Sequence, residues 1–353
     1  MSGFKIPFFG LERQHAYLKD ELLEATDRVL ASGQWMAGEN TEQLEQWLAH
    51  KNYSQYAITT HSGTIALEAI AKYYERSNYI PVKRALIPTL TFPATANAFI
   101  NSGWDVEFLD CNRSGQVEWH KHIDGSTEGI AVGVGLYGEY IEDIPHLPFI
   151  EDGAQHWLSN DCKFQGIART ISFDPTKNLP STGNAGAIVT NSEVMYEWLK
   201  GYFNHGKHHV PFAGTNARMS ELEAAHLLVR KNYLQDWQSK RRAIAKYWIY
   251  RFSNTKVRVV MKNVMTHGLQ KFVIEINNRD HVRVNLASDG IETRIHYEKP
   301  LHELKQYEKY KGPGLINNAS SLTRRVLSLP FYPELSGDEV EFIADRVLHH
   351  TQK

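Results

Sequence analysis

The sequence contains few cysteines, no excess of charge of either sign and no long apolar run. Cys111 and Cys162 are too few for a disulfide framework in a chain of 353 residues, so we expect a reducing compartment and a cytoplasmic protein. The 39 basic and 40 acidic residues give a formal net charge of −1, and no long-range field favours nucleic acid or an anionic membrane as a partner. Any anionic ligand must therefore be held by a local site.

The chain also lacks the usual signals for export and for membrane insertion. Its first ten residues contain no basic stretch followed by an apolar run, so we expect no signal peptide. No stretch approaches the roughly 20 apolar residues that cross a bilayer. Hydrophobic residues make up 42% and charged residues 22%, as in ordinary soluble globular proteins. The length predicts two domains, or one large domain with a smaller appendage.

Short apolar runs alternate with helical patterns through the first two thirds of the chain. Several runs are continuously apolar, as in strands that are buried on both faces. They cover residues 56–60, 84–88, 105–110, 129–135, 149–152, 170–173 and 187–190. Helical periodicity at 12–30 and a capping-box pattern at 40–43 predict two helices ahead of them. The alternation predicts an α/β fold with a mostly parallel, seven-stranded sheet flanked by helices.

The last third has a different pattern. We expect a long helix over 221–245, strands at 271–276 and 292–296 with a helix between them, and a final helix opened by the capping box Ser336-Gly-Asp-Glu339. These elements predict a smaller α+β domain. We therefore expect a large domain at residues 1–240 and a small C-terminal domain at residues 241–353.

Three features follow predicted strands, at the edge where an open α/β sheet binds ligands. The turn Ser62-Gly63-Thr64 opens a helix and offers free backbone N–H groups to a phosphate, although a plain helix N-cap has the same pattern. Asp152 ends a very apolar strand, where a carboxylate is costly unless it faces a cation or caps a helix. Lys177 lies in a stretch with little charge and is either a solvent-facing loop lysine or an amine nucleophile.

Together the three features fit one ligand, pyridoxal 5′-phosphate (PLP). This cofactor needs an anion cradle for its phosphate, a carboxylate that keeps its ring nitrogen protonated and a lysine for its aldehyde. We expect no metal, because His205, His208 and His209 are loosely spaced and no carboxylate or cysteine accompanies them.

Many short motifs, in order along nearly the whole chain, resemble the DegT/DnrJ/EryC1/StrS family of PLP-dependent sugar aminotransferases, which have the fold type I aminotransferase architecture. The motifs include Ser62-Gly-Thr-Ile-Ala-Leu67, Thr91-Phe-Pro-Ala-Thr-Ala96, Ile150-Glu-Asp-Gly-Ala-Gln155, Ser172-Phe-Asp-Pro-Thr-Lys-Asn-Leu179, Asn216-Ala-Arg-Met-Ser-Glu-Leu-Glu-Ala-Ala225 and Leu327-Ser-Leu-Pro-Phe-Tyr-Pro333.

The resemblance implies a role for each matching residue. Lys177 forms the Schiff base and moves the proton at the substrate carbon, and Asp152 pairs with the ring nitrogen. The other implied cofactor contacts are Gly63, Thr64 and Ser172 at the phosphate, Phe92 on the ring face, Gln155 at the phenolic oxygen and Asn216 from the other subunit. Trp35, His296 and Tyr297 are implied on the substrate side. The role of Asn216 implies a homodimer with shared sites.

The resemblance also implies a reaction, the transfer of an amino group from an amino acid, with glutamate expected, to the keto group of a nucleotide-linked sugar. The Ser172–Leu179 motif and Ala185-Gly186 are more similar to members that act at C3 than at C4. Two departures from the family pattern, Asp174 and Asn184, put the choice of substrate in doubt.

Two alternatives stay open. Family members that deoxygenate a sugar carry a histidine in place of the Schiff-base lysine, so Lys177 argues against that reaction. A non-catalytic PLP-binding regulator is the other alternative, and the sequence shows no additional DNA-binding domain that would favour it.

Overall fold

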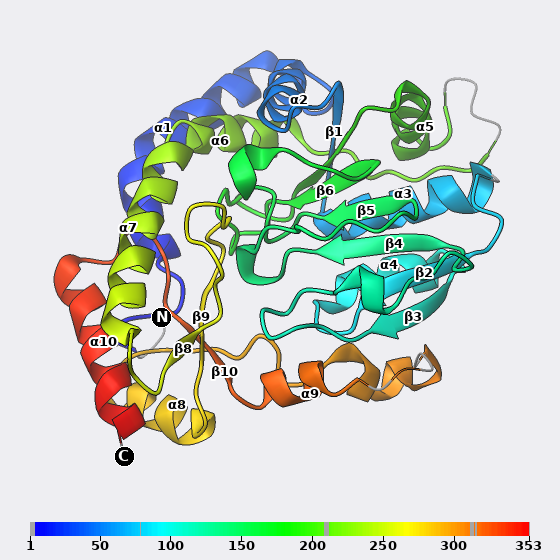
Figure 1. The fold of residues 1–353 in the computed structure, drawn as a ribbon. Helices are drawn as coiled ribbons and strands as arrows, with labels where there is room; N and C mark the ends of the chain where they lie inside the picture. Colours follow the sequence, from blue (N-terminus) through cyan, green and yellow to red (C-terminus); the bar gives the residue numbers. More distant parts are fainter. Residues whose placement is uncertain (1–3, 78, 208–211, 311–313, 315, 353) are drawn as a thin grey trace.

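The computed structural model describes the chain except residues 1–3, 78, 208–211, 311–313, 315 and 353. Two helices, α1 (Leu11–Ser32) and α2 (Glu39–Lys51), precede a seven-stranded sheet (Figure 1). Its strands are β1 (Tyr56–Thr60), β2 (Arg84–Pro88), β3 (Asp105–Leu109), β4 (Ile130–Val134), β5 (Phe149–Asp152), β6 (Ala168–Ser172) and β7 (Gly186–Thr190).

The strand order is β1-β7-β6-β5-β4-β2-β3. The neighbours from β6 to β3 run parallel to one another, and β7 alone is antiparallel to both of its neighbours. This confirms the α/β fold with a mostly parallel sheet. Parallel neighbours align their carboxyl ends, so the segments that follow β2, β4, β5 and β6 meet at one edge.

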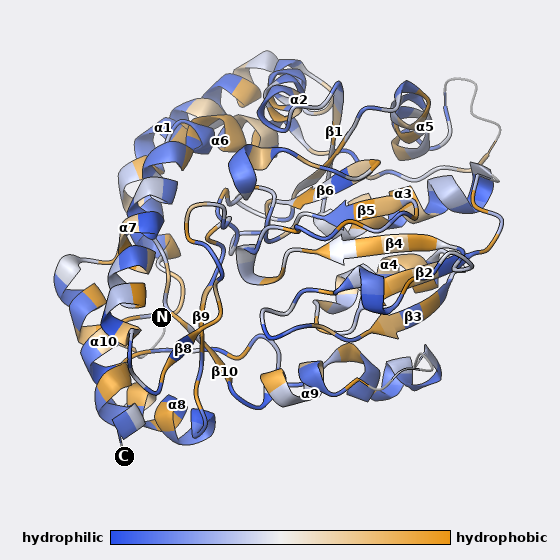
Figure 2. Ribbon diagram, viewed as in Figure 1, coloured by the Kyte–Doolittle hydropathy of each residue, from blue (hydrophilic) through white to orange (hydrophobic). Residues whose placement is uncertain are grey.

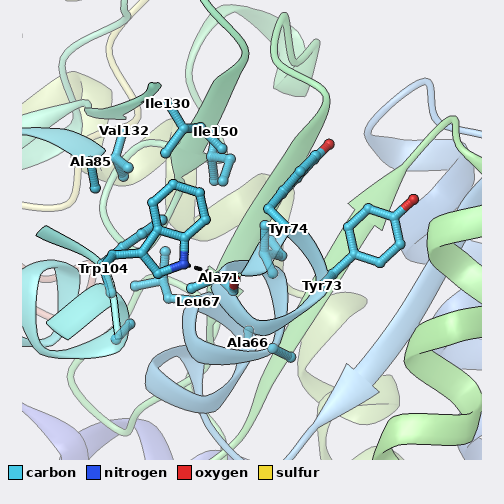
Figure 3. Packing of buried hydrophobic residues seen from close by; sticks show 14 of the residues in the cluster. Ala66, Leu67, Ala71, Tyr73, Tyr74, Ala85, Trp104, Ile130, Val132 and Ile150 are labelled. Atoms are coloured by element: carbon cyan, nitrogen blue, oxygen red, sulfur yellow. Dashed lines mark hydrogen bonds between the residues drawn. The ribbon is translucent and has the colours of Figure 1, made fainter. Parts of the chain in front are cut away.

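Both faces of the sheet are buried, which explains why several of its strands, such as β2 and β4, are almost continuously apolar (Figure 2). Ala85 and Ile87 of β2 belong to a core shared with α3 (Gly63–Ser77), α4 (Pro93–Asn101) and α5 (Glu193–Phe203). Leu86, between them, packs on the opposite face with Trp119 and Phe149. In the first core the indole N–H of Trp104 donates to the Ala71 carbonyl at 3.0 Å (Figure 3), so the large ring is buried without an unpaired donor.

The C-terminal part contains a three-stranded antiparallel sheet in the order β10-β9-β8. Its elements are β8 (Arg258–Val259), β9 (Phe272–Glu275), α8 (Arg279–Ser288), α9 (Asn318–Thr323), β10 (Val326–Leu329) and α10 (Gly337–Gln352). Trp248, Phe272 and Ile343 form their own core, which also contains Ile6 from the N-terminal segment. Short 3₁₀ turns occupy Trp119–Lys121, Leu136–Gly138, Asn160–Cys162, Leu301–Glu303 and Lys305–Tyr310.

Helix α7 (Leu234–Phe252) runs across the boundary expected at residue 240, and the division into residues 1–240 and 241–353 stays a prediction. The expected single helix over 221–245 is wrong. Helix α6 (Glu221–Lys231) ends before α7 begins, at a turn in which Tyr233 N donates to the Arg230 carbonyl at 3.1 Å. No glycine or proline marks this turn, so hydrophobic periodicity runs through it.

The strand expected at 292–296 is also wrong. Arg294 forms one isolated bridge with Ser328 of β10, and the chain then turns towards the pocket described below. In the part of the chain that the structure describes, no helix combines the length and apolarity needed to cross a membrane.

Candidate active site

Three strand ends meet at a tight turn between β1 and α3. A Cβ atom added to Gly63 would lie 2.9 Å from the Ser172 Cβ at the end of β6, and one added to Gly186 would lie 2.6 Å from Gly63 N. Glycine is therefore required at both positions for the backbones to approach. The turn opens α3, a helix of 15 residues, and its N-terminal N–H groups can receive a phosphate.

Asp152 is the last residue of β5 and is buried, with 5% of its surface exposed. The Thr95 hydroxyl donates to its Oδ2 at 2.7 Å, and Ala154 N donates to its Oδ1 at 3.1 Å. The Thr91 hydroxyl lies 2.9 Å from that of Thr95 and extends the chain of hydrogen bonds. The carboxylate is thus fixed by two donors, which is the arrangement a buried charge needs.

Lys177 follows β6 in a turn closed by its own N–H, which donates to the Asp174 carbonyl at 2.8 Å. Loss of water around the side chain lowers the pKa of its ammonium, and the carboxylates of Asp174 and Asp152 oppose this shift. A lysine with a lowered pKa has a larger neutral fraction and is a better amine nucleophile.

These residues share a pocket of about 450 Å³. Among the residues expected from the sequence, Gly63, Thr64, Phe92, Asp152, Gln155, Ser172, Lys177, His296 and Tyr297 line it. Gln155 is held from both ends, because its Oε1 accepts from Tyr137 N at 2.7 Å and its Nε2 donates to the Tyr297 hydroxyl at 3.1 Å. Phe92 is 56% exposed, and its ring centroid lies 6.3 Å from that of Tyr297. We call Asp152, Ala154 and Gln155 the β5 side of the pocket.

Another part of the pocket is basic. Lys271, Arg294 and His296, which we call the β9 side, come from the start of β9 and from the segment beside β10. Burial, followed by the nearby cations Lys271, Arg294 and Lys177, lowers the pKa of His296 to about 2, so its ring is neutral. Its Nδ1 lies 2.9 Å from the Ser328 hydroxyl.

Trp35 and Asn216 do not line this pocket. Both are exposed, Trp35 by 51%, and Asn216 forms an isolated bridge with Asn204. The proposed reach of Asn216 into another subunit's site stays a prediction. The sequence interpretation missed Thr91 and Thr95, whose spacing of four residues at a helix start was a usable signal, and it missed Lys271.

Of the three histidines discounted as ligands, His208 and His209 lie outside the described residues. Within the described part of the chain, no group of three or more His, Cys, Asp or Glu side chains could hold a metal.

The pocket fits PLP in its chemistry. It contains a glycine turn that a side chain would fill, a buried carboxylate fixed by two donors, and a lysine whose pKa is lowered. These match the phosphate, ring nitrogen and aldehyde of that cofactor.

Comparisons with known proteins agree with the geometry. Residues 16–348 match the model of the DegT/DnrJ/EryC1/StrS aminotransferase family. A dTDP-3-amino-3,6-dideoxy-alpha-D-galactopyranose transaminase of Aneurinibacillus thermoaerophilus is 30% identical, over 97% of this chain and 98% of that protein. A pleiotropic regulatory protein of Geobacillus stearothermophilus is 28% identical, over 97% of both chains.

The fold comparison gives a similar result. The crystal structure of S. venezuelae DesV in complex with a ketimine intermediate superposes with a TM-score of 0.90. It is 26% identical, and the alignment covers 99% of each chain.

Proposed function

Because the chain belongs to the DegT/DnrJ/EryC1/StrS aminotransferase family, we propose that it transfers an amino group from an amino acid to the keto group of a nucleotide-linked sugar. It is a PLP-dependent aminotransferase. The observation that carries the proposal is the single pocket that joins Lys177, Asp152 and the Gly63 turn. When bound, PLP supplies an aldehyde that carries the amino group and a ring that withdraws electrons from the reacting carbon.

Different residues of the pocket would hold different parts of the cofactor and move the proton. The Nζ of Lys177 would hold the aldehyde and then take the proton from the donor carbon and return it. The carboxylate of Asp152, fixed by Thr95 and Ala154 N, would keep the ring nitrogen protonated. The Gly63–Thr64 turn with Ser172 would receive the phosphate.

Gln155 and Phe92 would position the ring. The side chain of Gln155 is fixed between Tyr137 and Tyr297, so it can present a polar group at the phenolic oxygen without moving. The exposed face of Phe92 is available for stacking. His296 and Tyr297, which also line the pocket, would contact the substrate.

Two finer points rest on the relatives and on the exposed surface. We propose glutamate as the donor. We also propose C3 as the keto position, since the name of the Aneurinibacillus relative places the amino group at C3. We also propose a homodimer, in which the exposed Asn216 completes the phosphate site of the partner subunit and Trp35 lies at its mouth. The protein would act in amino sugar biosynthesis, for example for a surface polysaccharide, in the cytoplasm.

The test is a two-step reaction with purified protein. Glutamate should convert the pyridoxal form to the pyridoxamine form, which absorbs at shorter wavelength, and a nucleotide-linked 3-keto sugar should reverse the change. Nuclear magnetic resonance of the product gives the aminated carbon. A PLP absorbance band that depends on Lys177, combined with no amino transfer to any keto sugar, would instead support a regulatory role such as the name of the Geobacillus relative indicates.

A further inference from the structure

Lys271 is a second lysine in the pocket. It directly precedes β9, and its backbone N–H donates to the Tyr137 carbonyl at 2.9 Å, which anchors the residue between the two sheets. Its side chain lines the same pocket as Lys177 and Asp174, and only 8% of its surface is exposed. A lysine this buried is rare unless its charge is paired.

The ammonium of Lys271 has no such partner among the described residues. Within the described part of the chain, no hydrogen bond and no ion pair involves its Nζ, although Asp174 and Arg294 are near enough to act on it electrostatically. Burial, followed by the charge of Lys177, lowers the pKa of Lys271 to about 7. An unpaired buried ammonium costs several kcal/mol, which an anion bound beside it would offset.

The groups around Lys271 do not supply that anion. Arg294 adds positive charge and is itself engaged by Glu292, whose Oε1 lies 3.0 Å from its NH2. The imidazole of His296 is neutral. Asp174 uses its Oδ1 to accept from Thr176 N at 2.9 Å and makes no ion pair with either lysine. The β9 side therefore carries a surplus of positive charge.

The cofactor phosphate is not the missing anion. Its cradle is formed by the β1–α3 turn with Ser172 and Gly186, at the ends of β1, β6 and β7. Lys271 also lines a second, narrow cavity with Lys177 and Phe331, which none of Ser62, Gly63 and Thr64 reaches. Both lysines therefore line both cavities, whereas the phosphate turn borders only the larger one, so Lys271 lies beside the reacting Lys177 and outside the contacts that form the phosphate cradle.

We propose that Lys271 binds a carboxylate of a substrate that reacts at Lys177, with Arg294 adding long-range attraction. The inference rests on the proposed amino transfer. The carboxylate belongs either to the amino acid donor or to an acidic sugar acceptor, and both present the same chemistry to an ammonium. Lys271 is in this sense a specificity-determining residue.

The experiment compares holoenzyme of the wild type with Lys271→Met and Lys271→Arg, and with Lys246→Met as a matched control on the exposed face of α7. Calorimetric titration with glutarate, a dicarboxylate that cannot react, measures binding without turnover. Loss of one charge-assisted hydrogen bond should weaken glutarate or glutamate binding by about 10- to 100-fold in Lys271→Met. Lys271→Arg should recover most of it, and Lys246→Met should match the wild type.

A second arm identifies the source of the carboxylate. Nucleotide-linked amino sugars with and without a C6 carboxylate are titrated into the same variants. If Lys271→Met binds glutarate and glutamate more weakly than the wild type does, the carboxylate belongs to the amino acid donor. If only the binding of the acidic sugar is weaker, the carboxylate belongs to the acceptor. If Lys271→Met binds every carboxylate within twofold of the wild type, the proposal is overturned. Failure of any keto sugar to react would overturn the proposed acceptor but leave the glutarate result to decide on Lys271.

A stability measurement separates binding from folding. Because Lys271→Met removes an unpaired buried charge, the thermal midpoint of its ligand-free form should equal or exceed that of the wild type. The carboxylate that the titrations assign, from the donor or from the acidic sugar, should raise the midpoint of the wild type more than that of the variant. A variant that melts lower and gains as much from that carboxylate as the wild type would contradict the proposal.

Discussion

The two sides of the pocket differ in how their polar groups are paired. On the β5 side, both carboxylate oxygens of Asp152 accept hydrogen bonds. The side-chain amide of Gln155 accepts one hydrogen bond through its oxygen and donates one through its nitrogen. On the β9 side, the Lys271 ammonium has no hydrogen bond among the described residues, and Arg294 pairs with Glu292 and lies over the rings of Phe8 and Phe9. Groups that must stay fixed are satisfied by the protein, whereas a charge left unsatisfied is available to a ligand.

Removal of Lys177 should have the largest effect, because this residue serves both the cofactor and the proton. Lys177→Ala should lower the rate of amino transfer by at least about 10³-fold and abolish the Schiff-base absorbance. Single-turnover spectroscopy with glutamate measures both. Amino transfer in this variant at a tenth of the wild-type rate would show that another group does the chemistry.

Neutralisation of the β5 side should have the next largest effect. Asp152→Asn keeps the shape of the side chain but removes the charge that would hold a protonated ring nitrogen, so kcat should fall about 10²- to 10³-fold with PLP still bound. The measurement is kcat together with PLP affinity. An unchanged kcat would contradict the assignment of Asp152.

Changes of pH should affect paired and unpaired buried charges in different ranges. Burial raises the pKa of Glu151, but Arg169 and His156 outweigh it and lower that pKa from 4.5 to about 2. The unfolded state therefore binds a proton first as pH falls, and this contribution to stability is present above about pH 5 and is lost towards pH 2. The free energies of unfolding of the wild type and of Glu151→Gln, measured with denaturant, should converge as pH falls through that range.

Lys271 should show its effect at alkaline pH. Its folded pKa of about 7 lies below its unfolded value of 10.5, so its cost to stability is greatest below pH 7 and is relieved as pH rises towards 10.5. The stability advantage of Lys271→Met over the wild type should therefore shrink as pH rises from 7 to 10. An advantage that grows with pH would mean that the ammonium is paired in solution.

Removal of one of the hydrogen bonds that hold Asp152 should have the smallest effect on kcat. Thr95→Val removes the hydroxyl that donates to Oδ2 at 2.7 Å and keeps the volume of the side chain. We expect a roughly 10-fold loss of kcat, in line with about 1.5 kcal/mol for a hydrogen bond to a charged group. Ser102→Ala, which removes a buried hydroxyl bonded to Ala98 elsewhere on α4, is the matched control and should leave kcat unchanged. A loss as large as that of Asp152→Asn would show that Thr95 does more than support the carboxylate.

Helix starts show which interactions a sequence can reveal. The capping box at 336–339 is confirmed, since Glu339 N donates to the Ser336 hydroxyl at 3.2 Å and Ser336 N donates to Glu339 at 2.9 Å. The similar pattern at 40–43 is wrong. Helix α2 begins at Glu39, and Gly38, Asn40 and Thr41 all donate their backbone N–H to Glu221, which is about 180 residues away in sequence. A cap from a distant helix leaves no local signal.

The sequence by itself determined the alternating strands, the Gly63 turn, Asp152 and Lys177, because each depends on local chemistry or on an apolar run. Only the tertiary structure decided which side chains lie next to Asp152 and Lys177. Thr95 reaches Asp152 across 57 residues, and Lys271 comes to lie near Lys177 from 94 residues further along the chain. Burial without a partner is a property of packing, and it is what distinguishes Lys271 from a lysine on the surface.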